Sequence, residues 1–183
     1  ILEDIVNTGQ RPNLEEYPET IFVTLKMLFL SEDEATINAE QLSAVLQPKS
    51  LLTFQEKPGD VFEPVRERIR TQSGRLRKLG PDYLLYTLLD CVFENYLKVL
   101  EIMGERIEEF DEEVLSNPTH ELLEEINAYR REIAYIRKAV RPAKEIAVKL
   151  AKTDNELVSP EIHHFLRDLA DMAEQANDSV EIY

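Results

Sequence analysis

The sequence predicts an α/β fold, in which a layered sheet with helices precedes a long antiparallel helical hairpin and the start of another long helix. Three observations predict this fold. Short runs rich in β-forming residues recur early in the chain, at residues 21–30, 39–47 and 51–54. From Asp82 onward, apolar residues recur at steps of three and four, which is typical of one helix face. Polar segments at 116–119 and 153–158 interrupt this spacing and so predict three helices.

The composition is that of a folded, acidic domain. Of the 183 residues, 43% are hydrophobic, which suffices for a core and excludes a disordered acidic tail. The formal net charge of −15 argues against nucleic acid as a partner, because phosphate backbones require Lys and Arg. The same charge favours cation binding or simply solubility.

The cellular setting is indicated by what the sequence lacks. Cys91 is the single cysteine, which excludes an internal disulfide and fits a reducing compartment. We expect neither a signal peptide nor a transmembrane helix. The longest uncharged apolar run, residues 83–89, is far shorter than the ~20 residues that span a bilayer.

Residues 1–80 are predicted to form a partial α/β sheet region. The three β-rich runs predict an antiparallel meander, since polar turns at 31–34 and 48–50 separate them. Asp60 is expected to start a helix, with Pro64 in its first turn. A basic loop should follow before residue 81.

Residues 81–152 are predicted to form the hairpin. Its first helix should run from Asp82 for about 34 residues, roughly 50 Å at 1.5 Å per residue. Residues 116–119 should stop it and cap the second helix, with Pro118 in the first turn. So short a turn forces the two helices to fold back antiparallel. Pro142 is expected to kink the second helix.

The charges of the hairpin are segregated. Residues 101–125 hold ten acidic residues and one Arg, whereas residues 129–152 hold eight basic residues and two Glu. One interpretation is ion pairing on solvated surfaces, worth about 0–1 kcal/mol per pair. The alternative is a cation-attracting tip, where the antiparallel fold gathers acidic residues without local neutralisation. These residues are Glu108, Glu109, Asp111, Glu112, Glu113, Glu121, Glu124 and Glu125.

Residues 153–183 are predicted to begin a third helix. Pro160 should start it, and it should still be helical at Tyr183, so we expect the natural protein to continue. A polar stripe that includes His164, Asp168 and Asp171 lies beside its apolar stripe.

Two stretches resemble a known family. They are Phe-Gln-Glu-Lys-Pro-Gly-Asp-Val-Phe-Glu-Pro at 54–64 and Lys-Leu-Gly-Pro-Asp-Tyr-Leu-Leu-Tyr-Thr-Leu-Leu-Asp at 78–90. Both resemble the cytoplasmic domain of the CorA family of divalent-cation channels. Shorter similarities, such as Leu-Glu-Asp-Ile at 2–5 and Phe-Leu-Arg-Asp at 165–168, extend the resemblance over nearly the whole chain.

The resemblance implies the CorA soluble-domain fold, with residues 153–183 as the start of a long stalk helix. The family also has a strand-and-helix portion before residue 2, membrane helices and a Gly-Met-Asn tripeptide, which are missing here. We therefore expect a fragment that is truncated before the membrane segment.

The resemblance also implies a metal site. In CorA proteins, acidic residues matching Asp4 and Asp168 hold regulatory divalent ions between subunits, so Asp4 would face Asp168 of the partner subunit. Glu3 and Asp90 would contribute to an adjacent site, and Asp171 lies one turn from Asp168. Without the resemblance, Glu3 and Asp4 are an ordinary helix-surface pair, and Asp90 is a hydrogen-bonded structural group.

Mg²⁺ suits such a site, with Co²⁺, Ni²⁺ or Zn²⁺ as alternatives. Mg²⁺ prefers oxygen ligands, retains water and is commonly held by one or two carboxylates. Two carboxylates about 4 Å apart repel by roughly 4 kcal/mol at an effective dielectric constant of about 20, and a bound cation would turn this repulsion into a bridge.

The function implied is a regulatory, divalent-cation-sensing domain of a Mg²⁺/Co²⁺ transporter, with bound Mg²⁺ favouring the closed channel. The full protein would be a membrane homopentamer, with this part at the cytoplasmic face of the inner or plasma membrane. A close rival is the zinc-transporting ZntB branch of the same superfamily. A rival of another class is a structural helical module that docks a protein and binds no metal.

Other site types find less support in the sequence. His164 and Asp168 are spaced i, i+4, but two ligands do not make a structural zinc site. Arg66, Arg68 and Arg70 lack a glycine-rich phosphate loop, so surface salt bridges are expected there. The sequence has no recognisable catalytic motif, and we do not expect an enzyme.

Overall fold

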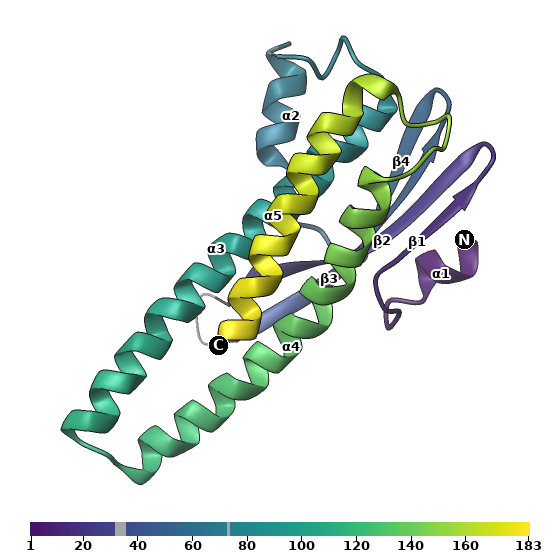
Figure 1. The fold of residues 1–183 in the computed structure, drawn as a ribbon. Helices are drawn as coiled ribbons and strands as arrows, with labels where there is room; N and C mark the ends of the chain where they lie inside the picture. The colour runs from purple at the N-terminus through teal and green to yellow at the C-terminus, as the bar shows by residue number, and fades with distance from the viewer. Residues whose placement is uncertain (32–35, 73) are drawn as a thin grey trace.

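The protein is a mixed α/β structure in which long helices pack on a four-stranded antiparallel sheet (Figure 1). The computed structural model describes residues 1–31, 36–72 and 74–183. Strands β1 (Asn13–Tyr17), β2 (Thr20–Leu30), β3 (Ile37–Gln47) and β4 (Ser50–Gln55) lie side by side in chain order. The antiparallel meander is therefore confirmed.

The sheet has one strand more than the sequence predicts. β1 has only five residues, of which two are Glu and only Leu14 is buried, so it gives no clear strand pattern. It forms as an edge strand paired with β2 over residues 20–24. Of the predicted turn at 31–34, only Ser31 lies within the described residues.

The two long helices have nearly the predicted bounds. α3 (Pro81–Ser116) has 36 residues and α4 (His120–Ala151) has 32. The prediction that Pro118 lies in the first turn of α4 is wrong, because Thr119 is the N-cap. The Thr119 hydroxyl accepts a hydrogen bond from the Leu122 N–H at 3.1 Å, which satisfies a free donor of the helix end. α4 continues through the buried Pro142, and the kink there stays a prediction.

The shorter helices differ from the prediction at their starts. α1 (Leu2–Val6) is a single turn at the beginning of the chain. α2 (Glu63–Arg70) begins at Glu63 rather than Asp60, although Pro64 does occupy its first turn. The third predicted helix starts at Pro160 as a 3₁₀ turn, η1 (Pro160–Ile162), and continues as α5 (His163–Ile182).

Helix α5 lies between α3 and α4 and packs against both (Figure 1). Its apolar stripe faces these helices and is buried. The stripe consists of Leu166, Leu169, Ala173, Ala176 and Val180. Beyond the end of α5, the rings of Phe110 on α3 and Tyr129 on α4 meet edge to face, with centroids 5.3 Å apart. Within the described ranges, every helix lacks an apolar stretch long enough for a membrane crossing.

The second half of β2 depends on α3 for its hydrogen bonding. Because β1 pairs only with residues 20–24, the rest of that edge has no strand partner among the described residues. The Tyr96 hydroxyl donates to the Lys26 carbonyl, and the Asn95 amide donates to the Leu28 carbonyl at 2.6 Å. Backbone carbonyls need such partners when they leave water, so side chains of α3 replace a strand at this edge.

Replacing Tyr96 by Phe should lower the free energy of unfolding by about 1–2 kcal/mol, because the Lys26 carbonyl loses its donor while the ring packing is kept. Tyr96 is fully buried, whereas Tyr135 is 42% exposed and serves as the control. Urea denaturation of Tyr96→Phe and Tyr135→Phe measures the difference. Equal stability of Tyr96→Phe and the wild type would contradict this role of Tyr96.

Candidate metal site

Asp4 lies on α1, which Gln41 of β3 holds against the sheet. The Gln41 amide donates to the backbone carbonyls of Asp4 at 3.1 Å and Ile5 at 3.5 Å. The Asp4 carboxylate accepts a hydrogen bond from the Gln10 amide at 3.1 Å. Asp4 thus presents an oriented carboxylate that is 27% exposed.

Glu3, Asp168 and Asp171 are the exposed carboxylates among the predicted ligands. Glu3 precedes Asp4 on α1. Asp168 and Asp171 lie on α5, away from its buried stripe. Neither of these two has a hydrogen-bond or ion-pair partner among the described residues, so their oxygens are free to bind a hydrated cation.

Asp90 is the half-buried member of the predicted set and lies on α3. Burial first, and then the charge of Glu94, raise the pKa of Asp90. A hydrogen bond with Tyr86 and the charge of Arg68 act in the opposite direction, while Asp168 adds repulsion. Asp90 is therefore a carboxylate that a nearby cation would stabilise in its charged form.

The structure brings Asp90 and Asp168 near each other and leaves Asp4 elsewhere. Asp90 and Asp168 lie on the packed helices α3 and α5 and repel each other. α1, by contrast, lies on the other side of α4 from α5 in Figure 1. Over residues 1–31, 36–72 and 74–183, no group of three His, Cys, Asp or Glu side chains could hold a metal ion. A site that joins Asp4 to Asp168 would need a second copy of the chain.

His164, the candidate zinc ligand, packs against a neighbouring aromatic ring. Its ring lies against Phe165, with centroids 3.8 Å apart and planes inclined by 37°. Neither His163 nor His164 belongs to a three-residue metal-binding group in the described part of the chain.

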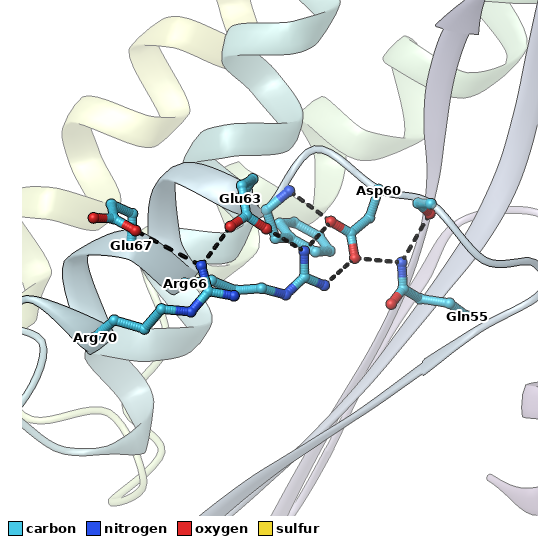
Figure 2. Close-up of polar contacts among 8 residues, drawn as sticks. Gln55, Asp60, Glu63, Arg66, Glu67 and Arg70 are labelled. Carbon is cyan, nitrogen blue, oxygen red and sulfur yellow. Dashed lines mark hydrogen bonds and ion pairs between the residues drawn. The ribbon is translucent and has the colours of Figure 1, made fainter.

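Arg66 and Arg70 form ion pairs, as the sequence predicts, rather than an open anion site (Figure 2). Arg66 donates to Asp60 Oδ1 at 2.7 Å, and Gln55 donates to Asp60 Oδ2 at 3.1 Å. Arg70 lies 2.5 Å from Glu63. The contact with Arg66 lowers the pKa of Asp60, whose side chain is only 5% exposed. This network fixes the start of α2 to the end of β4.

The hairpin tip is partly neutralised by Arg106, contrary to the prediction of no local neutralisation. The Arg106 guanidinium lies 2.7 Å from Glu109 and 3.1 Å from Glu113, both on α3. It also lies 3.2 Å from Glu125 on α4 and 4.2 Å from the centroid of the Phe110 ring. One arginine therefore joins the two helices at their most acidic part.

Comparison with known proteins decides the family. The family model described as CorA-like Mg²⁺ transporter protein matches residues 1–183, the whole chain. The chain belongs to the CorA family.

Relatives by sequence include named transporters. The chain is 37% identical over 183 residues to the cobalt/magnesium transport protein CorA of Thermotoga maritima, and the match covers 100% of the chain and 52% of that CorA. It is 23% identical over 182 residues to the putative metal ion transporter YfjQ of Bacillus subtilis, covering 98% of the chain and 55% of YfjQ. The chain thus spans about half the length of the curated relatives it matches.

Solved structures confirm the predicted CorA soluble-domain fold. The soluble domain of CorA from Methanocaldococcus jannaschii matches with a TM-score of 0.85 at 20% identity, over 100% of the chain and 72% of that structure. The ZntB cytoplasmic domain of Vibrio parahaemolyticus matches with a TM-score of 0.80 at 16% identity, over 100% of the chain and 71% of that structure. Both likenesses concern the fold, which CorA and ZntB share.

Three residues that shape the candidate site are absent from the set predicted from the sequence. Gln10 and Gln41 position Asp4, and Tyr86 contacts Asp90 while its ring lies 5.2 Å from that of Phe165. Gln41 alone has a sequence signal, because a polar amide inside a strand needs hydrogen-bond partners. The partners of Gln10 and Tyr86 follow only from the tertiary structure.

Replacing Arg66 by Gln should destabilise the protein in a pH-dependent way. The folded-state pKa of Asp60 is lowered, so its ion pair contributes stability above the ordinary Asp pKa near ~3.9, and this contribution is lost as the pH falls below it. We expect a loss of roughly 1 kcal/mol at neutral pH, because the exposure of Arg66 screens the pair. The loss should shrink in acid.

Chemical denaturation from about pH 3 to about pH 8 checks this dependence. Arg68→Gln is the matched control, since Arg68 lies on the same helix and has no ion-pair partner among the described residues. A loss for Arg66→Gln that is constant with pH, or equal in Arg68→Gln, would count against the Asp60 pair.

Proposed function

We propose that this chain is the regulatory, cation-sensing part of a CorA-type Mg²⁺/Co²⁺ transporter. In this proposal, Mg²⁺ bound between Asp4 and Asp168 of the partner subunit favours the closed channel. The observation that carries the proposal is the family match over residues 1–183. The relative from Thermotoga maritima is by name a cobalt/magnesium transport protein.

The orientation of Asp4 and the exposure of Asp168 and Asp171 support a site shared between subunits. The Gln10 amide donates a hydrogen bond to the Asp4 carboxylate and orients it. Asp168 and Asp171 are exposed and have no ion-pair partner in the described part of the chain. Since α1 and α5 lie on different sides of α4, the two ligand groups would meet only across subunits.

A second, adjacent site would use Glu3 and Asp90, and Asp171 lies one turn from Asp168 as a further candidate ligand. Asp90 already experiences the charges of Glu94 and Asp168, and a cation would relieve this repulsion. Both sites would be weak, because a Mg²⁺ ion that keeps its water gains little from one or two carboxylates. A millimolar dissociation constant corresponds to only about −4 kcal/mol, which suits the sensing of an abundant ion.

The cation would act by clamping subunits together. Each bound ion stabilises the assembly that binds it, so plentiful Mg²⁺ would hold the subunits in one arrangement and scarce Mg²⁺ would release them. In the whole protein, a homopentamer in the membrane, residues 1–80 would form the sheet region and 81–152 the hairpin. Residues 153–183 would begin the stalk towards the membrane from the cytoplasmic face. This proposed role involves cation binding and no catalysed reaction.

The zinc-transporting ZntB type is the second candidate, because the ZntB domain of Vibrio parahaemolyticus has the same fold. The set Glu3, Asp4, Asp90, Asp168 and Asp171 consists of carboxylates only, and oxygen ligands favour Mg²⁺ over Zn²⁺. Binding of Mg²⁺ and Zn²⁺ to the same protein, compared directly, distinguishes the two candidates.

Mg²⁺ at about 20 mM should protect the assembled wild-type protein from protease, with a stabilisation of roughly 1–2 kcal/mol for a millimolar site. The double variant Asp4→Ala/Asp168→Ala should lose this protection. Limited proteolysis with and without Mg²⁺ measures it.

The matched control is Glu161→Ala/Asp178→Ala, which removes two exposed carboxylates from η1 and α5. The control should keep the Mg²⁺-dependent protection of the wild type. Undiminished protection in Asp4→Ala/Asp168→Ala would refute the shared site, as would an equal loss in the control.

A further inference from the structure

A groove of about 800 Å³ lies between residues 9–12, strands β2 and β3, and the outer face of α4. Its size falls within the roughly 300–1,000 Å³ of small-molecule sites. Pro12, Ala139 and Pro142 are buried and give it an apolar lining, to which Ala39 adds.

The groove gathers positive charge on an acidic protein. Five of the 21 Lys and Arg residues line it, against one acidic residue, Glu145. Glu145 is already paired with Arg11 at 3.5 Å. Lys138 and Arg141 are exposed and have no hydrogen-bond or ion-pair partner among the residues that the structure describes. Cations that converge on a concave surface attract an anionic ligand.

Gln10 Oε1 is a buried acceptor at the groove that lacks a hydrogen-bond partner in the described part of the chain. Among the described residues, Gln10 Oε1 and Arg137 Nε are the buried side-chain nitrogen or oxygen atoms without a partner, and both residues line the groove. The Arg137 guanidinium instead faces α5, where it donates to the Val180 carbonyl at 2.9 Å and its Nε lies 3.6 Å from Glu181. Unpaired buried polar atoms are uncommon in native proteins, so an unpaired acceptor at the groove points to an absent polar ligand.

Tyr135 adds a flat surface beside these charges. It is 42% exposed and lies on α4 one turn before Lys138 and Ala139. An exposed tyrosine ring is a platform on which a nucleobase can stack. A bare phosphate would leave the ring, the apolar lining and most of the groove volume unused.

We propose that this groove binds a nucleoside phosphate, with its phosphates on Lys138 and Arg141 and its base against Tyr135. Arginine matches phosphate oxygens with paired donors, and lysine adds a point charge. Amino or hydroxyl groups of the nucleoside supply the donor that Gln10 Oε1 lacks. This site uses none of the carboxylates assigned to Mg²⁺, so it does not rest on the proposed function.

Isothermal titration calorimetry of the 183-residue chain with ATP, in buffer without divalent cations, tests the proposal. The wild type should bind ATP, and Lys138→Gln/Arg141→Gln should weaken this binding at least tenfold. The matched control is Lys149→Gln/Lys152→Gln, which removes the same charge from exposed residues at the end of α4 and should bind ATP as the wild type does.

A second variant separates the base from the phosphates. Tyr135→Ala should weaken ATP binding severalfold and leave the binding of inorganic triphosphate unchanged. Asp168→Ala, which leaves Gln10 and its partner Asp4 intact, should bind ATP normally, so a failure of the Mg²⁺ site would be detected separately. The proposal is overturned if ATP at about 1 mM does not bind, if the two double Gln variants bind ATP equally, or if triphosphate binds as tightly as ATP.

Discussion

The burial of one face of α5 between α3 and α4 is the constraint on which the rest of the arrangement depends. The stripe from Leu166 to Val180 is buried, so the opposite face, with Asp168 and Asp171, has to point outward. Gly104 on α3 marks how closely the end of α5 approaches, because a side chain there would collide with the Tyr183 hydroxyl. Packing of α5 therefore fixes the backbone that carries these two carboxylates.

Helix periodicity makes α3, α4 and α5 predictable from the sequence, because each repeats its apolar spacing over many turns. β1 is not predictable in this way, since Leu14 is its only buried residue and the strand depends on the edge of β2. The cap of α4 shows a similar limit: Pro118 and Thr119 both suit a helix start, and only the hydrogen bond to Thr119 decides between them. The candidate ligands came from the resemblance to a family, whereas the contact of Gln10 with Asp4 depends on how the chain folds back after α1.

The charge of this protein is divided between two surfaces with different chemistry. Carboxylates on α1 and α5 are the proposed oxygen ligands, while Lys and Arg side chains line the groove beside α4 in a chain of net charge −15. Gln10 belongs to both regions, because its amide donates to Asp4 and its unpaired oxygen borders the groove. A ligand that is hydrogen-bonded to this oxygen would be linked to the Asp4 carboxylate through the Gln10 side chain alone. Most of the groove cations lie in a segment, 129–152, whose segregated charge is already visible in the sequence.

The sharing of a cation between subunits is tested most directly by combining two single variants, Asp4→Ala and Asp168→Ala, in one assembly by co-expression. Some interfaces of the mixed assembly then pair an intact Asp4 with an intact Asp168 from different chains. A shared site predicts that each variant alone has lost Mg²⁺-dependent protease protection and that the mixed assembly recovers part of it. Protection that stays absent in the mixed assembly, or that persists in either variant alone, would contradict a cation held between these two residues.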